Sequence, residues 1–228
     1  MSSQQPHDDF SADLILVYAD DNKSSVKIID DGDETSPIVP FMYLGPHFSA
    51  ERDSDYLRNS KSITHILNVT KEISCKHKDS LTTIQILIDD NPNEALEHHI
   101  PQALQFINDC MKEKGTILVH CQAGISRSSS MVIAFVMNCL RMNLHDAYHY
   151  VKKRRSCISP NVGFISKLAN YEIQILGVNK SSLDLQDYYA TWILEFFPSV
   201  MTKERIKEII EEKGDFDEAL DCILSSSF

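Results

Sequence analysis

The sequence predicts an α/β domain followed by a small bundle of three helices. Through residue 176, short β-branched runs alternate with longer stretches whose apolar residues recur at helical spacing, a pattern typical of α/β domains. From residue 187 onward there is no strand pattern, and three short helical patterns are separated by Pro198 and Gly214. With 228 residues, 43% of them hydrophobic, the chain is long enough for one medium and one small domain.

The predicted strands are short and rich in β-branched residues. Segments 14–18 and 26–29 are separated by a turn-rich stretch and are expected to form a hairpin. The acidic stretch 30–37 ends in proline and is interpreted as a linker. Four further strands are expected at residues 42–45, 63–70, 83–88 and 116–120.

Four helices are expected between and after these strands. Apolar residues recur at helical spacing in 94–113, and Gly115 ends that helix. The segment 128–142 is apolar nearly all round, which predicts a helix buried in the core. The remaining helices are expected at 144–155 and 163–176.

These elements divide the chain into four parts. Residues 1–37 form an acidic N-terminal segment with the expected hairpin, and residues 38–177 form the α/β domain. Residues 178–183 are a short linker. Residues 184–228 form the three-helix unit, whose length is near the lower limit for independent folding.

Charge is distributed unevenly and argues against two classes of partner. The net charge is −11, with −7 in residues 1–36 and −6 in residues 178–228. The middle of the chain, 37–177, carries +2, so it can accept an anionic ligand. The overall acidity argues against nucleic acid and against an anionic membrane as partners.

The N-terminus and the cysteines indicate the compartment. The first residues are polar and acidic, unlike a signal or transit peptide, and no apolar run reaches the roughly 18 residues that a membrane span needs. Six cysteines are scattered between residues 75 and 222 without paired spacing. A reducing setting, cytoplasmic or nuclear, is therefore expected. The sequence contains no metal-binding cluster.

The residues that carry chemistry lie between a predicted buried strand and a predicted buried helix. This segment, His120 to Ser128, reads HCQAGISRS. Backbone N–H groups that gather at such a helix N-terminus form a site for anions. Gly124 permits a tight backbone path, and Arg127 offers a planar fork of N–H donors to two phosphate oxygens. Cys121 lies at the centre of this positive field and is expected to be a thiolate, a nucleophile aimed at phosphorus.

This arrangement of Cys, five residues and Arg, with His before and Ser after, resembles the signature of protein tyrosine phosphatases. The strings LVHCQAGISRSSS, ITHILNVT and MYLG, with Ser159-Pro160-Asn161 and Gly163-Phe164, resemble the dual-specificity branch. The resemblance covers about residues 38–177. It implies the cysteine-phosphatase fold, a central mixed sheet flanked by helices. It also implies hydrolysis of phosphotyrosine and of phosphoserine or phosphothreonine in proteins through a phosphocysteine, without metal or cofactor.

Cleavage of a phosphoester also needs an acid that protonates the leaving oxygen. Asp89 and Asp90, on the loop after the predicted strand 83–88, are the candidates. Asp90 lies 31 residues before Cys121, which is the spacing that the resemblance implies for this acid. We therefore assign Asp90, with Asp89 as the alternative.

The resemblance implies three supporting residues. Ser128 would hydrogen-bond the departing thiolate in the second step, and His120 would orient the phosphate loop. Asn161 would brace the same loop through side-chain hydrogen bonds. Each has a structural alternative: a helix cap for Ser128, a buried core histidine for His120 and a turn residue for Asn161.

The loop that follows Cys121 is expected to bind the substrate phosphate. In the phosphoinositide-hydrolysing branch, the variable positions of this loop usually carry Lys. This chain has no basic residue at those positions, which favours a phosphoprotein substrate. The basic run 152–155 either receives an acidic or doubly phosphorylated segment or is a solvated helix end. The candidate substrate-binding residues are Gln122, Ala123, Gly124, Ile125, Ser126 and Arg127.

The chain is also similar to pseudophosphatases of this branch, in which the Cys is replaced and phosphoprotein is bound without turnover. This chain keeps Cys121, so the main reason to expect inactivity is absent. A phosphoprotein-binding module with little turnover remains the alternative function. Release of phosphate from an aryl phosphate distinguishes the two.

The three C-terminal helical patterns resemble CUE domains, small bundles that bind ubiquitin. Phe196-Phe197-Pro198 stands where that family has Met-Phe-Pro, and Ile223-Leu224 stands where it has two leucines. The resemblance implies that these five residues form an exposed apolar patch for ubiquitin. The alternative is a helical extension that docks on the α/β domain, since apolar stripes at helical spacing usually belong to a core.

Overall fold

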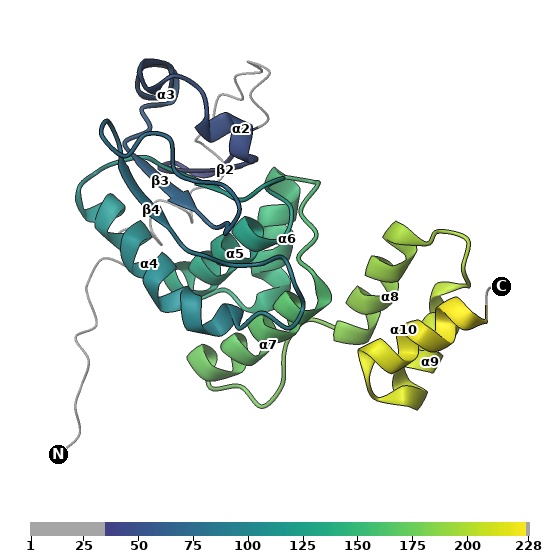
Figure 1. The fold of residues 1–228 in the computed structure, drawn as a ribbon. Coiled ribbons are helices and arrows are strands. Elements are labelled where there is room, and N and C mark those ends of the chain that lie inside the picture. Colours follow the sequence, from purple (N-terminus) through teal and green to yellow (C-terminus); the bar gives the residue numbers. More distant parts are fainter. Residues whose placement is uncertain (1–34, 227–228) are drawn as a thin grey trace.

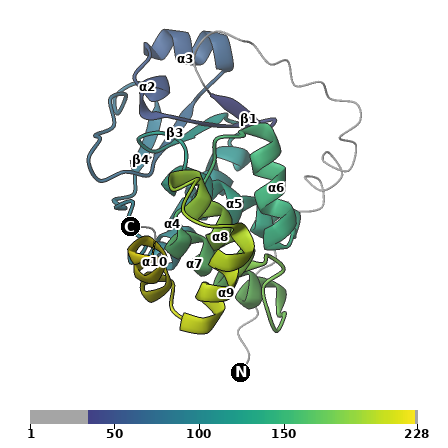
Figure 2. The same cartoon turned by 90° about the vertical axis from the view of Figure 1, so that its right-hand side faces the viewer.

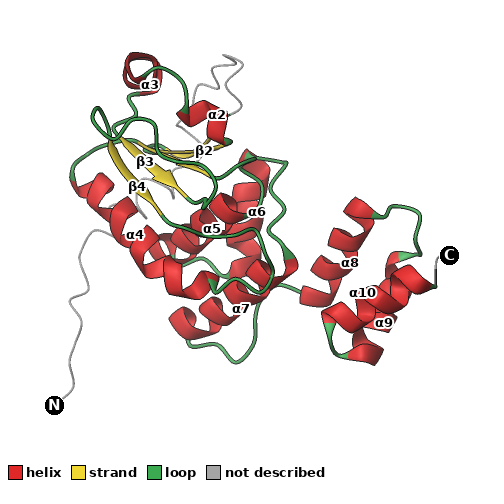
Figure 3. Cartoon of the chain, viewed as in Figure 1, coloured by secondary structure: helices red, strands yellow, loops and turns green. Residues whose placement is uncertain are grey.

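The computed structural model describes residues 35–226 (Figure 1). The expected hairpin at 14–29 lies outside the described residues. The described part contains a sheet with helices on both faces, followed by three helices that are set to one side of it (Figure 3). The predicted fold class, an α/β domain with a small helical unit, is therefore confirmed.

The sheet has five strands in the order β1-β2-β5-β3-β4. β1 (Ser36–Val39) pairs antiparallel with β2 (Met42–Gly45). β2 and β3 (His65–Asn68) both run parallel to the central β5 (Ile117–His120), and β4 (Thr82–Gln85) runs parallel to β3. The sheet is mixed, as expected. Because its four parallel strands end at one edge, the loops that follow β3, β4 and β5 meet there.

Helices cover both faces of this sheet, and each face has its own hydrophobic cluster. Side chains alternate along a strand, so Leu67 and Val119 join the large cluster beneath α4 to α7, whereas Ile66 and Leu118 join a smaller one beneath α2 and α3. The completely buried Phe135 packs inside the large cluster. The helices are α2 (His47–Ala50), α3 (Ser54–Lys61), α4 (Leu96–Lys112), α5 (Arg127–Leu140), α6 (Leu144–Arg154) and α7 (Val162–Leu176).

Three elements differ from the expectation. β1 begins at Ser36, inside the segment interpreted as a linker, and its Pro37 is tolerated because β1 is an edge strand. The short helices α2 and α3 were not expected. α3 buries only Leu57 and Lys61, which is too few positions to give a helical period, and it begins at an Asp53 cap.

The C-terminal unit consists of α8 (Leu185–Phe196), α9 (Lys203–Lys213) and α10 (Phe216–Ser225) (Figure 2). Alanine and isoleucine side chains of all three helices form a separate core. Tyr188, near the start of α8, belongs instead to the core of the α/β domain. α8 is therefore shared between the two cores.

The predicted linker 178–183 is tied to the α/β domain. The carboxylate of Glu172, a residue that is 1% exposed, accepts hydrogen bonds from Leu144 N, Ser182 N and Ser181 Oγ. Although burial opposes the charge, these bonds hold the pKa of Glu172 below its ordinary value. Among residues 35–226, no helix has both the length and the apolar character needed to cross a membrane.

Candidate active site

The phosphate loop lies at the edge of the sheet where the parallel strands end. β5 is the central strand, and residues 121–126 connect it to the N-terminus of α5. The loops after the neighbouring β3 and β4 carry Glu72 and Asp90 to the same edge. Strand order thus brings together three segments that are far apart in the sequence.

Cys121 lies at the base of this loop and is 1% exposed. Its Sγ accepts hydrogen bonds from the backbone N–H of Gly124 at 3.2 Å and from the hydroxyl of Ser128 at 3.1 Å. The hydroxyl of Ser128 therefore points at the sulfur, and the N-cap position of α5 is held by Ser126.

Gly124 allows the loop to close tightly around this sulfur. Its φ of +68° lies in the left-handed region, and a Cβ there would stand 2.6 Å from the carbonyl carbon and oxygen of Gly45. Both the conformation and the close approach to the end of β2 exclude a side chain. Gly124 is thus required by the path that aims its own N–H at Cys121.

Arg127, the first residue of α5, is 4% exposed and is held by a carboxylate. Its Nη2 lies 2.7 Å from Glu72 Oε1, and its Nη1 donates to Glu72 Oε2 at 2.8 Å and to the carbonyl of Ile88 at 3.2 Å. Burial opposes the charge of Arg127, but the hydrogen bond that Arg127 donates to Glu72, together with the nearby charges of Glu72 and Asp90, outweighs burial and raises the guanidinium pKa.

A guanidinium has five N–H donors. The contacts with Glu72 and Ile88 use both N–H groups of Nη1 and one N–H group of Nη2. Within the described part of the chain, the buried Nε of Arg127 has no hydrogen-bond partner. We call Nε–H together with the second Nη2–H the open edge of Arg127. Because both donors lie in the guanidinium plane along the same edge, the open edge is suited to two oxygens of one phosphate.

Glu72 was not singled out from the sequence. A network around the end of β3 fixes its loop: Asn68 Nδ2 donates to Ile73 O at 2.6 Å, and Gln85 Nε2 donates to Thr70 O at 2.9 Å. The bond to Arg127 holds the pKa of Glu72 below its ordinary value, so it stays ionised. A lone loop acid has no pattern in one sequence. The sequence indicates such a residue only indirectly, because an arginine that is buried in the site requires a carboxylate partner.

The two candidate acids point in different directions. Asp90 Oδ1 accepts from Ser126 Oγ at 2.7 Å and from Asn161 Nδ2 at 2.9 Å, while Oδ2 lies 3.6 Å from Arg127 Nε. Asp89 instead forms an ion pair with Lys71 at 2.9 Å on the surface. The structure therefore places Asp90 beside the phosphate loop and directs Asp89 away from it.

The two remaining predicted residues are buried beside the loop. Asn161 braces Asp90 and also caps α7, because its Oδ1 accepts from the N–H of Phe164. His120 is 2% exposed, and its Nδ1 lies 3.2 Å from the carbonyl of Cys121. Burial lowers the pKa of His120 to about 4, so the ring is neutral near pH 7.

The rim of the loop is exposed at Gln122, Ala123 and Ile125. Beneath the rim, Arg155 is 7% exposed, and its Nε and Nη2 donate to the carbonyls of Gly124 and Ala123 at 2.8 and 3.1 Å. Arg155 thus supports the loop from below. Like Glu72, Arg155 was not expected to support the loop, because a residue in the basic run 152–155 is expected to face solvent or substrate.

The basic run does not form one surface. Lys152 donates to the carbonyl of Ile158 at 2.6 Å, and the Arg154 guanidinium stacks 3.4 Å from the ring centre of Tyr150. With Arg155 also turned inward, the run is divided among three separate sites.

In residues 35–226 there is also no group of His, Cys, Asp and Glu side chains that could hold a metal ion.

The predicted C-terminal patch is only partly at the surface. Phe196 and Phe197 are 59% and 40% exposed, and Pro198 is exposed. Ile223, in contrast, is fully buried in the C-terminal core, and Leu224 is half-buried. The expectation that Ile223 is exposed was wrong, because the α10 stripe that includes it closes the three-helix core.

Comparison with known proteins gives consistent matches over the α/β domain. Residues 42–174 match the family "Dual specificity phosphatase, catalytic domain". Human dual specificity protein phosphatase 5 is 40% identical over 140 residues, which cover 61% of this chain and 36% of that protein. A putative tyrosine phosphatase, 123R, of invertebrate iridescent virus 6 is 39% identical over 139 residues, covering 61% of this chain and 92% of that protein.

A solved structure agrees with these matches. The human tyrosine phosphatase-like serine/threonine/tyrosine-interacting protein superposes with a TM-score of 0.59 at 35% identity, over 63% of this chain and 99% of that one. The chain spans 36% of the length of dual specificity protein phosphatase 5, and its C-terminal helices lie outside the family match. The match from the start of β2 through most of α7, with Cys121 and Arg127 inside it, means that the chain belongs to the dual specificity phosphatase family.

Proposed function

We propose that the chain is a phosphoprotein phosphatase that hydrolyses phosphotyrosine and phosphoserine or phosphothreonine through a phosphocysteine intermediate. The observation that carries this proposal is the open edge of Arg127 beside Cys121. Two hydrogen bonds reach the sulfur of Cys121, and the open edge offers a pair of donors to the phosphoryl group. Glu72 holds the opposite end of the guanidinium, so this orientation exists before substrate binds.

In the first step, the Cys121 thiolate attacks phosphorus in line with the leaving oxygen. The S–P bond forms as the P–O bond to the substrate side chain breaks, and Asp90 gives its proton to the departing oxygen. Arg127 and the N–H groups of the loop bind the phosphoryl oxygens throughout. The product protein leaves as the free alcohol or phenol.

In the second step, Asp90 is a carboxylate and takes a proton from water. That water attacks phosphorus, the S–P bond breaks, and inorganic phosphate is released. Ser128 donates its hydrogen bond to the departing thiolate, which makes the sulfur a better leaving group. The site returns to its starting protonation state, and the chain's own residues move every proton.

The assignment of the acid has its own test. Asp90→Asn should lower turnover most for substrates with poor leaving groups, such as phosphoserine, and less for activated aryl phosphates. Asp89→Asn, which removes a surface ion pair, is the matched control and should leave both rates nearly unchanged. The reverse pattern would move the role to Asp89, and no effect in either variant would place the acid elsewhere.

The experiment for the whole proposal is release of phosphate from an aryl phosphate by the full chain in the presence of a chelator. Cys121→Ser should abolish turnover, and retention of more than a few per cent of the rate would exclude the phosphocysteine route. Arg127→Lys keeps the charge but loses the open edge, so most of the rate should be lost. Near wild-type kinetics of that variant would show that the loop is not the site.

The second candidate in the same domain is a phosphoprotein-binding module with little turnover. One observation favours it, the 35% identity to a protein that is itself called phosphatase-like and interacting. The two functions separate in one measurement. A wild-type chain that binds a phosphopeptide but releases no phosphate is a binding module, whereas release of phosphate that Cys121→Ser abolishes identifies an enzyme.

The proposed substrate class rests on the rim of the loop. Gln122, Ala123, Ile125 and Ser126 bring no cation to the pocket, so nothing at these positions meets the additional phosphates of a phosphoinositide ring. A phosphorylated protein side chain carries only the one phosphate that the loop accommodates. Capture of phosphoproteins by the Cys121→Ser chain, followed by their identification, tests this choice.

We also propose a targeting function for residues 184–228, binding of ubiquitin. The supporting observation is the exposure of Phe196 and Phe197, with Pro198 beside them, at the end of α8. Leu224 is half-buried and the only other predicted contact at the surface, so the apolar patch is small. A small patch should bind weakly, with Kd on the order of tens to hundreds of micromolar.

Titration of labelled ubiquitin with the full chain tests this proposal. Saturable shift changes that disappear in Phe196→Ala/Phe197→Ala would support it. The matched control is Leu87→Ala, which removes an equally exposed side chain (58%) from the α/β domain and should leave the titration unchanged. No shift change at millimolar chain would end the ubiquitin proposal and leave α8 to α10 as a helical extension.

The proposed compartment is the cytoplasm or the nucleus. All six cysteines are free thiols, among them the nucleophile Cys121. A thiolate nucleophile functions only while it stays reduced, so the proposed chemistry requires a reducing setting. Fractionation of cells that express a tagged full chain tests this proposal.

A further inference from the structure

α8 connects the C-terminal unit with the loop that supports the active site. Ala190 and Ile193 of α8 belong to the C-terminal core, whereas Tyr188 is 8% exposed and lies in the core of the α/β domain. The Tyr188 ring packs edge-on against Tyr148 of α6, with ring centres 5.5 Å apart. One helix is therefore fixed by both cores, and its position relative to the α/β domain is determined.

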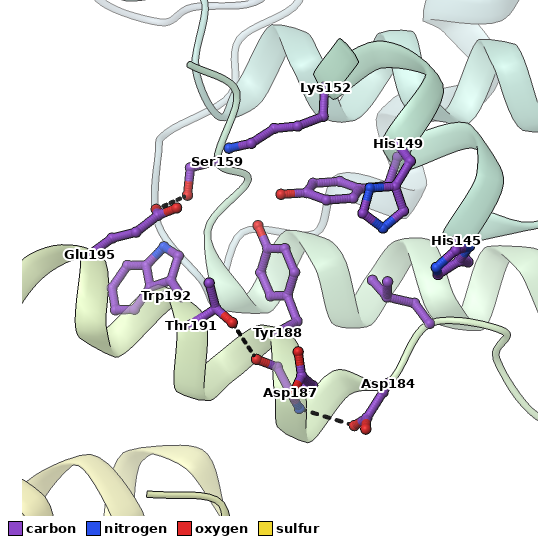
Figure 4. A pocket seen from close by; sticks show the side chains of 12 residues that line it. His145, His149, Lys152, Ser159, Asp184, Asp187, Tyr188, Thr191, Trp192 and Glu195 are labelled. Atoms are coloured by element: carbon purple, nitrogen blue, oxygen red, sulfur yellow. Dashed lines mark hydrogen bonds between the residues drawn. The ribbon is translucent and has the colours of Figure 1, made fainter. Parts of the chain in front are cut away.

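From this position α8 makes two hydrogen bonds to the loop between α6 and α7. The hydroxyl of Tyr188 donates to the carbonyl of Pro160 at 2.7 Å, in a buried setting. The carboxylate of Glu195, two turns further along, accepts from Ser159 Oγ at 2.8 Å (Figure 4). Burial holds the pKa of the Tyr188 hydroxyl above its ordinary range, so it remains a protonated donor.

The same short loop is bonded to the catalytic residues on its other side. The N–H of Ser159 donates to the carbonyl of Ile125 in the phosphate loop at 3.0 Å. Asn161 donates from its backbone N–H to Ser126 Oγ at 3.1 Å and from its side chain to Asp90 at 2.9 Å. The residues that α8 contacts, Ser159 and Pro160, are thus directly next to the residue that holds Asp90.

The contact with α8 is not backed by continuous packing. A cavity of about 320 Å³ lies between α6 and α8, and Figure 4 shows Ser159, Tyr188 and Glu195 around it. On the α6 side, Lys152 holds the carbonyl of Ile158 at 2.6 Å. Ile158 anchors one side of the loop in the main core. On the hollow side, these few hydrogen bonds connect the loop to α6 and α8.

We propose that Tyr188, assisted by Glu195, is a positioning residue for the general acid: it fixes the 158–161 loop, and through Asn161 it sets the orientation of Asp90. The inference rests on the proposed phosphatase function. It assigns to the C-terminal helices a part in the chemical step, in addition to any partner that they bind. The wild-type orientation of Asp90 then requires α8 in place.

The test compares two substitutions of adjacent tyrosines in the full chain. Tyr188→Phe removes the hydroxyl that binds Pro160 and keeps the ring. Tyr189→Phe is the matched control, because the Tyr189 side chain interacts with Ser166 of α7 and not with the loop. For each variant we measure kcat with phenyl phosphate, a poor leaving group, and with 4-nitrophenyl phosphate, a good one. The ratio of the two rates is independent of the fraction of folded enzyme.

For Tyr188→Phe we expect the phenyl phosphate rate to fall about three- to tenfold, the effect of one lost hydrogen bond, and the 4-nitrophenyl phosphate rate to change less than about twofold. Glu195→Ala should shift the ratio in the same direction by a smaller factor, and Tyr189→Phe should not shift it. An unchanged ratio in Tyr188→Phe, while Asp90→Asn shifts it, would overturn the inference and leave the phosphatase proposal intact. Activity that survives in Cys121→Ser would instead remove the proposed function itself.

Discussion

The ion pair beside Cys121 and one ion pair between α8 and α9 have the same length and different surroundings. Arg127 Nη2 lies 2.7 Å from Glu72, and Lys203 Nζ lies 2.7 Å from Asp187. The Arg127 side chain is 5% exposed, whereas the Lys203 side chain is 34% exposed. Distance alone therefore does not distinguish the two regions, and the difference lies in how much water each cation has lost.

This difference decides what each ion pair does. A buried arginine that loses its carboxylate is left as an uncompensated charge, whereas a lysine at the surface is solvated again by water. Glu72 also leaves the open edge of Arg127 facing the phosphate loop, so its main effect is orientation. The α8–α9 pairs have no such task, and we expect them to contribute little to stability and nothing to catalysis.

The largest effect should follow from removing the carboxylate of the buried pair. Glu72→Gln leaves one acceptor oxygen and turns an amide donor towards the guanidinium, so the open edge of Arg127 is no longer fixed. Misplacement of a catalytic group by about 1 Å costs up to about 100-fold in rate. We expect kcat/KM for an aryl phosphate to fall about 10- to 100-fold, measured in steady state.

The control for this substitution is a carboxylate at the other end of the sheet. Glu113 lies 3.3 Å from His65 and is 66% exposed, and His65 begins β3, at the opposite end of the parallel strands from the phosphate loop. Glu113→Gln should retain wild-type kinetics. If Glu72→Gln also retained wild-type kinetics, Glu72 would have only a structural role. The buried ion pair would then matter no more for catalysis than the exposed ones.

The same contrast explains which parts of the site were accessible from the sequence. The phosphate loop is a contiguous string, so the roles of Cys121, Gly124 and Arg127 followed from spacing and charge. Glu72 and Arg155 come from segments about 50 residues before and about 30 residues after that string, and only the strand order and the α6 packing bring them to it. Their contribution is a property of the fold and not of any local pattern.

The fold was predictable for a related reason. Elements buried in a core, such as β5 and α5, carry an apolar pattern that identifies them. α3 buries two side chains and β1 begins with Ser-Pro, so neither has a period to detect. Ile223 is buried although the resemblance to a ubiquitin-binding bundle implied an exposed residue, because it lies in the apolar stripe of α10 that faces the C-terminal core.

Burial at the phosphate loop should also make stability depend on pH. His120 has a pKa of about 4 in the folded chain because it is buried, against about 6.5 when unfolded. Since the folded state resists protonation, the stability gained from neutral His120 is complete above about pH 6.5 and is lost as pH falls towards 4. The loss should reach about 2 kcal/mol by pH 5 and about 3 kcal/mol in full.

Urea unfolding between pH 7.5 and pH 5 measures this dependence. His120→Asn removes the titrating ring, so the free energy of unfolding should vary less with pH over this window than in the wild-type chain. The comparison is His145→Asn, whose side chain is 52% exposed at the surface of α6. A wild-type slope that persists in His120→Asn would mean that another group causes it.

The smallest effect should come from the exposed pairs between α8 and α9. Lys207 lies 3.2 Å from Asp184 and 3.3 Å from Asp187. The pKa of Asp184 is lowered mainly because its carboxylate accepts a hydrogen bond from the N–H of Asp187, and the pKa of Asp187 is lowered mainly because its carboxylate accepts one from Lys203. Lys207 adds to both shifts. Lys207→Ala should nevertheless cost less than about 1 kcal/mol, because water replaces the lost partner at an exposed site. Kinetics on aryl phosphates should not change, and the small difference in stability should shrink further in 0.5 M salt. If Lys207→Ala instead lowers the free energy of unfolding by several kcal/mol and salt does not reduce this loss, Lys207 packs as part of the C-terminal core. Exposure would then not distinguish the two kinds of ion pair in this chain.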